Sequence, residues 1–251
     1  LKLLFVGDAM QHITQIKAAK VNDGYNYDSY FKHIQNEIEE ADIAIVNLEV
    51  TLGGKPYTGY PCFSAPDEFA MELKKVGFDI FLTSNNHCLD KGKNGLERTI
   101  LMLDSMRVKH LGTYTDQKSR NFRYPMMIKK NGIRIAMLNY TYGTNGLEVK
   151  APNIVNYIDK EQILKDIDMA QCMFADIIIA NMHWGDEYKL YPNKEQKDWA
   201  ELLIKNGVNL VIGGHPHVVQ PIDSRKENNS IKQVVVYSMG NFVSNMSANN
   251  T

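Results

Sequence analysis

The sequence contains little cysteine: three residues among 251, namely Cys62, Cys88 and Cys172. Three cysteines spaced this widely exclude a disulfide framework and a zinc knuckle. Cys88 follows a histidine, but its commoner role is that of a small buried hydrophobic residue. A core must therefore stabilise the chain, and 251 residues are enough for one large domain or two small ones.

The sequence also lacks an excess of charge and a long apolar run. It has 28 Lys and Arg against 29 Asp and Glu, a formal net charge of −1. Because no basic stripe is present, we expect no nucleic-acid partner. No apolar stretch approaches the roughly 20 residues that span a bilayer. Leu1 already lies in an expected strand, so we expect a native N-terminal signal or anchor to be missing, and any membrane association to use that segment.

The order of apolar patterns predicts strands alternating with helices. The spacing of Tyr30, Phe31, Ile34 and Ile38 predicts a helix that ends near Ala41. Lys130-Asn131-Gly132 predicts the turn of a hairpin. The other expected helices cover 67–76, 94–106, 160–174 and 194–206. The expected strands cover 1–7, 43–48, 79–84, 108–111, 125–130, 133–140, 176–182, 208–212 and 233–238.

This alternation favours an α/β layered fold with mixed sheets. We expect one domain over residues 1–243 and a polar tail over residues 244–251. Two long stretches without periodicity, 53–66 and 141–157, are expected to be loops. Long loops on the ligand-bearing side of a scaffold commonly carry substrate contacts.

Residue types that bind metals follow several expected strands. Gly213-Gly214-His215-Pro216-His217 comes directly after an apolar run. Two imidazoles two residues apart, beyond two glycines, can reach one or two metal ions. Four more strands end in similar chemistry, and their residues are Asp8, Glu49, Asn86 with His87, and His183. One shared site explains five such strand ends better than chance does.

Each of these residues alone has a plainer explanation. Asp8 after Gly7 is often a turn or helix-capping residue, and Asn86 is able to cap the turn before Lys91-Gly92. A single histidine at a strand end, such as His183, is more often structural. Glu49 ends an apolar run, where a carboxylate must be paired or bound to a metal because burying it alone is costly.

The order of the motifs along the chain carries a family resemblance. They are Gly7-Asp8, Asn47-Leu48-Glu49, Asn85-Asn86-His87 with Asp90, His183-Trp184-Gly185-Asp186-Glu187, Gly214-His215-Pro216-His217-Val218 and Tyr237-Ser238-Met239-Gly240-Asn241-Phe242. The sequence resembles the bacterial capsule-synthesis family of the CapA/PgsA type, which belongs to the calcineurin-like metallophosphatase superfamily. The resemblance covers residues 3 to 243 and implies a layered metallophosphatase-like sandwich of two mixed β-sheets flanked by helices.

The resemblance also implies roles for the strand-end residues. One divalent ion (Mn, Zn or Fe) would be held by Asp8 and His217, and Glu49 would bridge to a second. The second ion would be held by Asn86, His183 and His215. His87 would protonate the leaving group from the pocket mouth without binding metal, and Asp90 would orient it.

The sequence departs from the superfamily pattern at two positions. Met10 stands where the superfamily has a histidine, and Cys88 stands where it has an acidic residue. His12 is out of register and is expected to lie on the surface or cap a helix, while Glu187 either supplies a missing carboxylate or is solvated. We therefore expect one ion, or two of unequal affinity, with occupancy falling below about pH 6.5 as imidazole is protonated.

Three functions are compatible with these residues. The first is a metal-dependent phosphatase-like protein of capsule or poly-γ-glutamate synthesis or export, which uses a metal-activated hydroxide. It would act at the cell envelope, outside the cytoplasm, on an anionic polymer or phosphoester, with other subunits of a polymer synthesis or export complex. The second is a non-catalytic metal- or polymer-binding subunit of that complex. The third is a nucleotidase or phosphodiesterase.

Overall fold

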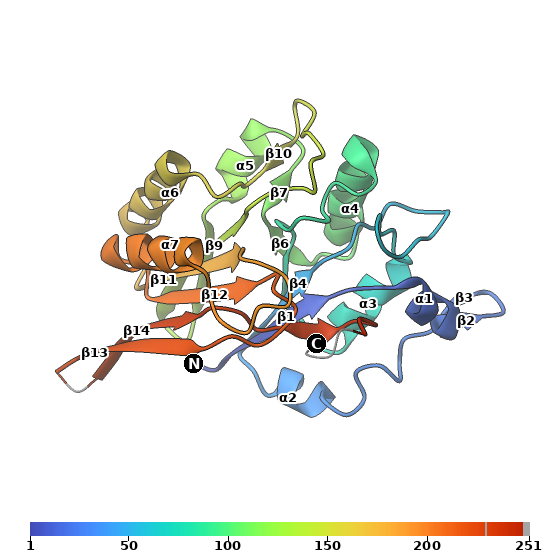
Figure 1. Cartoon of the computed structure of the whole chain (residues 1–251), viewed down its shortest axis with the longest axis horizontal. Helices are drawn as coiled ribbons and strands as arrows, with labels where there is room; N and C mark the ends of the chain where they lie inside the picture. The colour runs from blue at the N-terminus through green and yellow to red at the C-terminus, as the bar shows by residue number, and fades with distance from the viewer. Residues whose placement is uncertain (229, 248–251) are drawn as a thin grey trace.

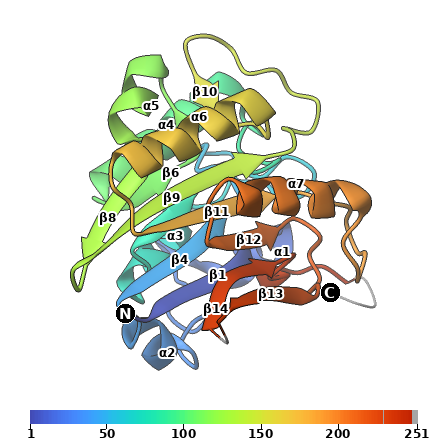
Figure 2. The ribbon, with the colours of Figure 1, turned by 90° about the vertical axis from the view of Figure 1, so that its left-hand side faces the viewer.

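Two β-sheets face each other at the centre of the molecule, and helices cover their outer sides (Figures 1 and 2). The computed structural model describes residues 1–228 and 230–247. The first sheet has the strand order β15-β1-β4-β5-β6, and the second has the order β13-β14-β12-β11-β9-β8. The predicted layered α/β fold with outer helices is confirmed.

The first sheet contains only parallel pairings, so the expectation of two mixed sheets is wrong for this one. Its strands are β1 (Leu3–Ala9), β4 (Ile43–Leu48), β5 (Ile80–Leu82), β6 (Lys109–Leu111) and β15 (Asn241–Val243). β1 lies between β4 and β15, so it is an interior strand although it is the first in the chain.

The second sheet is mixed, because its two edge strands run antiparallel to their neighbours. Its strands are β8 (Met126–Lys130), β9 (Ile133–Thr141), β11 (Ile177–His183), β12 (Leu210–Gly214), β13 (Ile222–Glu227) and β14 (Ser230–Val236). The predicted hairpin is β8–β9, and its turn residues Asn131 and Gly132 have φ of 51° and 82°. Two short pairs complete the strands: β2 (Lys20–Val21) with β3 (Gly24–Tyr25), and β7 (Thr113–Tyr114) with β10 (Ile154–Val155).

Seven helices are found in the described part of the chain. They are α1 (Ile13–Ala19), α2 (Gln35–Glu39), α3 (Asp67–Lys75), α4 (Gly92–Ser105), α5 (Gln117–Arg123), α6 (Lys160–Cys172) and α7 (Lys194–Lys205). α3 illustrates why these segments are helical. It begins at Asp67 and ends at Lys75, and each charge interacts favourably with the helix dipole at its own end. In Figure 2, α6 and α7 lie over the second sheet.

Alternate residues of β4 face different cores. Ile43 and Ile45 belong to the cluster between the sheets, whereas Ala44 and Val46 join the outer cluster that includes Phe69 of α3. Fully burying one such large side chain contributes about 1.5–3 kcal/mol. By the same period of two, Asn47 faces the space between the sheets, and this alternation brings polar side chains there.

Some expected elements differ from the structure. The helix expected from Tyr30 to Ala41 is wrong: only Gln35–Glu39 is helical, and Phe31 packs in the aromatic cluster with Phe69 from a turn. Helices α1 and α5 and strand β13 were not expected. α5 and β13 are mostly polar, and α1 has only seven residues, too few for a long apolar stripe.

The extent of the domain over residues 1–243 stays a prediction. Residues 248–251 of the expected tail lie outside the described residues. None of the helices in the described part of the chain combines the length and the apolar character needed to cross a bilayer.

Candidate metal centre

The structure brings the six predicted ligands together at the carboxyl ends of the strands. β1, β11 and β12 point to the same end of the molecule (Figure 1). Parallel strands that end together gather the residues following them, which is why α/β proteins place their sites at this edge. All six side chains are buried, with exposures between 0% and 3%: Asp8, Glu49, Asn86, His183, His215 and His217.

Glu49 lies at the centre of this cluster without a hydrogen bond. Neither carboxylate oxygen has a hydrogen-bond partner among the described residues. Oε1 lies 3.6 Å from His183 Nε2 and 3.9 Å from His217 Nε2. Burial, and next the nearby charge of Asp8, raise the pKa of Glu49 well above its ordinary value. A buried carboxylate so placed fits a cation, which would supply the missing partner.

Two overlapping triads have potential ligand atoms that all lie within 4.8 Å of one another. One consists of Glu49, His215 and His217, and the other of Asp8, Glu49 and His183. Glu49 belongs to both, which fits a bridging position. The expected division assigned Asp8 and His217 to one ion, and Asn86, His183 and His215 to the other. Each triad contains residues from both of these groups. The assignment of ligands to two ions therefore stays a prediction.

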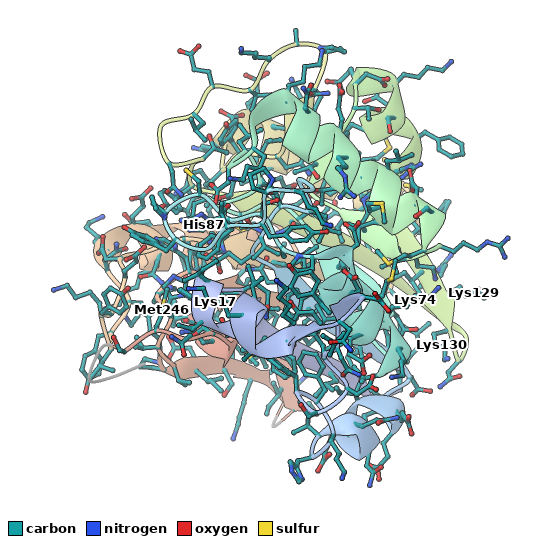
Figure 3. The ribbon with its side chains drawn as sticks, turned by 90° about the vertical axis from the view of Figure 1, so that its right-hand side faces the viewer. Lys17, Lys74, His87, Lys129, Lys130 and Met246 are labelled. Carbon is teal, nitrogen blue, oxygen red and sulfur yellow. The ribbon has the colours of Figure 1, made fainter. Side chains whose placement is uncertain are left out.

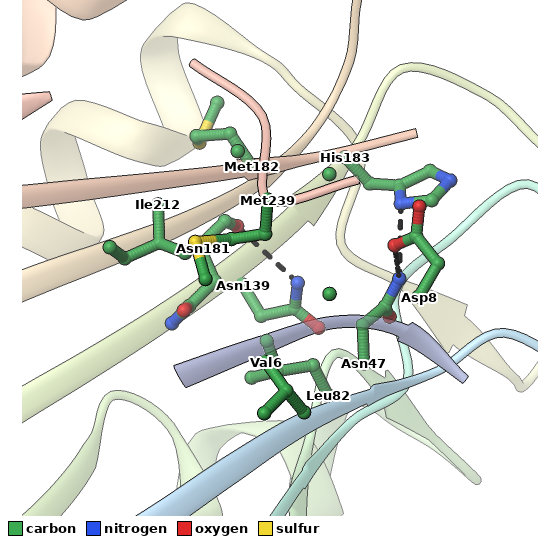
Figure 4. Close-up of a pocket in the computed structure, with 13 residues that line it drawn as sticks. Val6, Asp8, Asn47, Leu82, Asn139, Asn181, Met182, His183, Ile212 and Met239 are labelled. Atoms are coloured by element: carbon green, nitrogen blue, oxygen red, sulfur yellow. Dashed lines mark hydrogen bonds between the residues drawn. The ribbon is translucent and has the colours of Figure 1, made fainter. Parts of the chain in front are cut away.

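A β-bulge in β1 directs Asp8 into the site. Phe5 pairs with Ile45 of β4, but Asp8 pairs with Asn47, so β1 contains one extra residue. Because side chains alternate along a strand, the extra residue gives Asp8 the same face as Asn47. Asn47 Nδ2 donates to Asp8 Oδ1 at 2.7 Å and lies 3.3 Å from His183 Nδ1, as Figure 4 shows. Gly7 permits the bulge, since a Cβ there would lie 1.9 Å from the Gly240 carbonyl oxygen.

A small cavity lies behind these residues, between the two sheets (Figure 4). Its volume is about 20 Å³, and its lining includes Asn139, Asn181 and Met239. Asn181 Oδ1 is buried and has no hydrogen-bond partner in the described chain. This volume is close to that of one water molecule, so the cavity is too small to admit a substrate.

His217 is held by two side-chain oxygens. Its Nδ1 lies 2.9 Å from Asn241 Oδ1 and 3.3 Å from Asp8 Oδ2. These acceptors fix the proton on Nδ1, so Nε2, which has no hydrogen-bond partner among the described residues, faces Glu49. Burial works to lower the pKa of His217, but the hydrogen bond and charge of Asp8 outweigh it, and the pKa is raised. Burial likewise opposes ionisation of Asp8, yet His217, His183 and Asn47 lower the pKa of Asp8.

His183 and His215 are in a different electrostatic state. Burial lowers the pKa of His183 well below its ordinary value, and burial together with the neighbouring His217 lowers the pKa of His215 to about 4. Both imidazoles are therefore neutral at pH 7. His183 Nε2 lies 2.8 Å from Asn86 Oδ1, and His215 Nδ1 has no hydrogen-bond partner in the described part of the chain. Neutral imidazole and amide oxygen are ligands for manganese, zinc or iron.

The turn that carries the two histidines has an unusual backbone. His215 and His217 have φ of 96° and 60°, a region that side-chain-bearing residues seldom adopt. Such conformations persist only where the surroundings impose them, and they cluster at functional sites. Gly213 is required here because a Cβ would lie 1.9 Å from the Tyr237 carbonyl oxygen.

His87 and Asp90 form a separate pair beside the cluster. His87 Nδ1 lies 2.8 Å from Asp90 Oδ2, and the same oxygen accepts the Phe63 backbone N–H at 2.6 Å. The Phe63 ring meets the His87 ring edge-on, with centroids 4.6 Å apart. His87 is only 5% exposed, so the expectation that it lies openly at the pocket mouth is wrong: Phe63 from the loop 53–66 covers it.

The departures from the superfamily pattern have structural explanations. Met10 is fully buried in the outer apolar cluster. His12 is the N-cap residue of α1, as expected, and its backbone N–H donates to Gln15 Oε1. Cys88 packs with Leu96, and burial raises the pKa of its thiol to about 12, so it is a small hydrophobic residue here. Glu187 is exposed to solvent.

Sequence reasoning did not single out three side chains at the site. Asn47 joins Asp8 to His183. Tyr142 lies over His215, with ring centroids 4.6 Å apart, and Asn145 contacts both Asn86 (3.2 Å) and His87 (3.4 Å). The last two lie in the 141–157 loop, whose length was the only available signal. The stretch gives no periodic pattern from which to choose a residue.

Comparisons with known proteins agree with this geometry. A sequence profile described as bacterial capsule synthesis protein PGA_cap matches residues 2–246. Capsule biosynthesis protein CapA of Bacillus anthracis is 28% identical over 257 aligned positions, covering 97% of this chain and 59% of that protein. PGA biosynthesis protein CapA of Bacillus subtilis is 28% identical over 253 positions, covering 95% and 62%. This chain thus spans about three-fifths of these relatives.

Solved structures share the fold. NAD nucleotidase of Haemophilus influenzae has a TM-score of 0.58 and 13% identity, covering 96% of this chain and 50% of that chain. The 5'-nucleotidase of Candida albicans has a TM-score of 0.52 and 12% identity, covering 94% and 45%. At such identities these structures show a metallophosphatase-like fold alone. Together with the profile match over nearly the whole chain, the strand-end cluster identifies this protein as a member of the bacterial capsule synthesis protein family.

Proposed function

We propose that this chain is a metal-dependent phosphoester hydrolase of capsule or poly-γ-glutamate production. The observation that carries the proposal is the Glu49 carboxylate, which is fully buried, lacks a hydrogen-bond partner in the described chain and is faced by His183 and His217. An ionised carboxylate buried without compensation is strongly destabilising, and a divalent cation held between Glu49 and these imidazoles would supply the compensation.

The proposed ligands are those expected from the sequence: Asp8, Glu49, Asn86, His183, His215 and His217. When bound, a divalent ion stabilises charge on phosphoryl oxygens and makes water a better nucleophile near neutral pH. Asn47 and Asn241 orient Asp8 and His217 from behind. Such outer hydrogen bonds commonly set the tautomer and direction of metal-binding groups.

His87 is the proposed general acid. Its Nδ1 contacts Asp90, so Nε2 is the nitrogen available to give a proton to the leaving oxygen. Asn86 precedes it in the chain and contacts His183, so the acid lies next to the cluster. Because Phe63 covers His87, the loop 53–66 must shift, or the substrate must enter beside Tyr142, before the proton is transferred.

The names of the relatives support the proposed biological setting. Two Bacillus proteins that resemble this chain are described as capsule or PGA biosynthesis proteins. We place the activity at the cell envelope, outside the cytoplasm, with an anionic polymer or a phosphoester as substrate. Other subunits of a polymer synthesis or export complex are the proposed partners.

One observation favours a non-catalytic alternative. Met10 lies where the superfamily places a ligand histidine, and its side chain belongs to the outer apolar core. A site with a ligand missing suits metal-supported binding of a polymer as well as turnover. The alternative function is therefore a metal- or polymer-binding subunit of the same complex.

Metal analysis and a hydrolysis assay separate the two. Purified protein is tested for bound Mn, Zn and Fe, then assayed with p-nitrophenyl phosphate and bis-p-nitrophenyl phosphate after reloading with each metal. Turnover that EDTA abolishes and one metal restores supports hydrolysis. Bound metal without turnover of either ester supports the binding subunit. Protein that takes up none of the three metals contradicts both the hydrolase and a metal-binding subunit.

A further inference from the structure

A large hollow lies on the surface between α1, the β2–β3 hairpin and the loop 53–66. Its volume is about 560 Å³, and Ile13, Lys17, Lys20, Tyr25, Lys55 and Tyr57 line it. A neighbouring hollow of about 410 Å³ shares Ile13 and adds Tyr60 and Lys91. We refer to these two adjoining hollows as the lysine groove. Each hollow is within the roughly 300–1,000 Å³ typical of ligand sites, and because the two adjoin at Ile13 they suit a segment of a chain that runs across both.

The lysines of the groove are not engaged elsewhere. Lys17, Lys20 and Lys55 are exposed, and none of them forms an ion pair with a described residue, whereas Lys75 pairs with Asp28. Among the nearby acidic groups, Asp67 is already bound by Arg98 through two hydrogen bonds. Glu68, near Gly24, and the exposed Asp23 in the turn of the β2–β3 hairpin remain, so the lysines that line the groove still outnumber the acidic groups beside it. An anionic ligand therefore gains favourable charge contacts there.

The groove also offers an apolar surface between its charges. The Tyr25 and Tyr57 rings meet edge-on with centroids 5.3 Å apart. Ile13 is 43% exposed and Tyr60 74% exposed, although both are side chains that would normally be covered. Methylene and amide groups pack well on tyrosine, and its hydroxyl group is able to hydrogen-bond to an amide. This alternation of cation and aromatic ring suits a chain whose carboxylates are separated by methylene and amide segments.

The loop 53–66 connects the groove to the proposed general acid. A Cβ on Gly59 would lie 2.5 Å from the Ile13 backbone nitrogen, so the loop is packed against the start of α1. Four residues further along, Phe63 covers His87 and donates its backbone N–H to Asp90. In Figure 3, Lys17 and His87 lie on the same side of the molecule, while Lys129 and Lys130 lie at the opposite margin. A chain bound in the groove is thus positioned beside the site.

We propose that the lysine groove binds an extended polycarboxylate chain, with Lys17, Lys20 and Lys55 on its carboxylates. A polycarboxylate with methylene and amide segments is favoured over a polyphosphate because Ile13, Tyr25 and Tyr57 line the groove beside the lysines, and a polyphosphate has no apolar segment to pack on them. The choice of polymer rests on the proposed function, but the binding itself requires neither metal nor hydrolysis.

Binding of fluorescein-labelled oligoglutamate tests the proposal. Fluorescence anisotropy is measured with metal-free protein, wild type and the variant Lys17→Gln/Lys20→Gln/Lys55→Gln. Three lost surface charge contacts should weaken binding by at least about tenfold. The matched control is Lys109→Gln/Lys129→Gln/Lys130→Gln, which removes the same charge from residues that do not line the groove and should bind like wild type.

Three results would overturn the proposal: wild type that does not bind, equal losses in both triple variants, or polyphosphate binding as tightly as oligoglutamate. The groove variant is also assayed for metal content and for turnover of p-nitrophenyl phosphate, both of which should be unchanged. Oligoglutamate binding without metal-dependent turnover would sustain the groove while contradicting the hydrolase. Turnover without oligoglutamate binding would do the reverse.

Discussion

The metal centre has two proposed halves that share Glu49: one contains Asp8 and His217, and the other contains His183 and His215. They differ in the hydrogen bonds and protonation of their imidazoles. In the half with His217, a proton on Nδ1 is held between Asp8 and Asn241, and the pKa of this imidazole is raised. In the half with His183 and His215, burial keeps both imidazoles neutral, and the pKa of His215 is lowered to about 4. As pH falls, the imidazoles of the second half therefore stay neutral, and able to bind a metal, to lower pH than His217 does.

This difference reinforces the conclusion drawn from Met10. The His217 half has Met10 where a further histidine was expected, and Asp8 raises the pKa of His217, so protons compete with metal there to higher pH. Ligand number and proton competition therefore point the same way, towards a tight ion at His183 and His215 and a weaker one at Asp8 and His217. We therefore expect two environments of different affinity in one strand-end cluster.

The largest expected effect concerns His87, the proposed general acid, which lies beside the half with His183 and His215. His87→Ala should lower any phosphoester turnover by about 10²–10⁴-fold, the usual scale for general acid–base catalysis, and leave metal content unchanged. Metal analysis and steady-state kinetics are measured on the same preparation. His110→Ala is the matched control, since His110 is also buried and contacts an aspartate, Asp104, at 3.1 Å, but outside the cluster. Loss of metal in His87→Ala would make His87 a ligand instead.

The comparison of the halves is tested most directly by removing one imidazole from each. Titration of Mn or Zn into metal-free protein should give two separable steps, or one step with a stoichiometry near one. His183→Ala should weaken the tight step by more than about 100-fold, beyond the loss typical of outer hydrogen-bond partners. His217→Ala should affect mainly the weak step. Two equal, tight sites in the wild type would contradict the difference between the halves.

Replacing Glu49 should change how the stability of the metal-free protein depends on pH. The raised pKa of Glu49 means that the folded protein keeps this proton to higher pH than the unfolded chain does. Stability of the metal-free protein should therefore fall as pH rises from the ordinary value of 4.5 towards the raised pKa. Glu49→Gln should remove this fall and be more stable at pH 8 by about 1–3 kcal/mol. Urea unfolding at pH 6 and 8 measures it, and an unchanged pH dependence would show that Glu49 is already compensated.

The smallest effect is a separation of the two steps by pH. Protons compete with metal for imidazole, and His217 takes its proton first as pH falls because its pKa is raised. The weak step should lose about tenfold in affinity per pH unit below that pKa, while the tight step holds until His183 and His215 are protonated at lower pH. Calorimetric titrations at pH 7.5, 6.5 and 5.5 follow both steps. If the two steps instead lose affinity in parallel as pH falls, protonation of Glu49, which both share, controls both.

The sequence predicts the parts of this protein that depend on periodicity. Apolar strands and amphipathic helices appear near their expected bounds, and parallel strands bring the residues after them to one edge, so the cluster could be anticipated. The β1 bulge could not, because one extra residue leaves no trace in an apolar run such as Leu3–Val6. The cover over His87 and the lysine groove also escaped prediction, since the loop 53–66 and the short β2–β3 hairpin have no repeating pattern.

The position of β15 affects when a growing chain is able to complete the proposed metal centre. This strand returns to lie against β1, where Asn241 pairs with Asp8. Asp8 and Glu49 are synthesised early, but the imidazoles of the cluster arrive only with residues 183 to 217, and the strand beside Asp8 arrives later still. A growing chain thus has no complete cluster until residue 217 is made. The winding of the first sheet would therefore delay capture of the proposed metal until both sheets have formed.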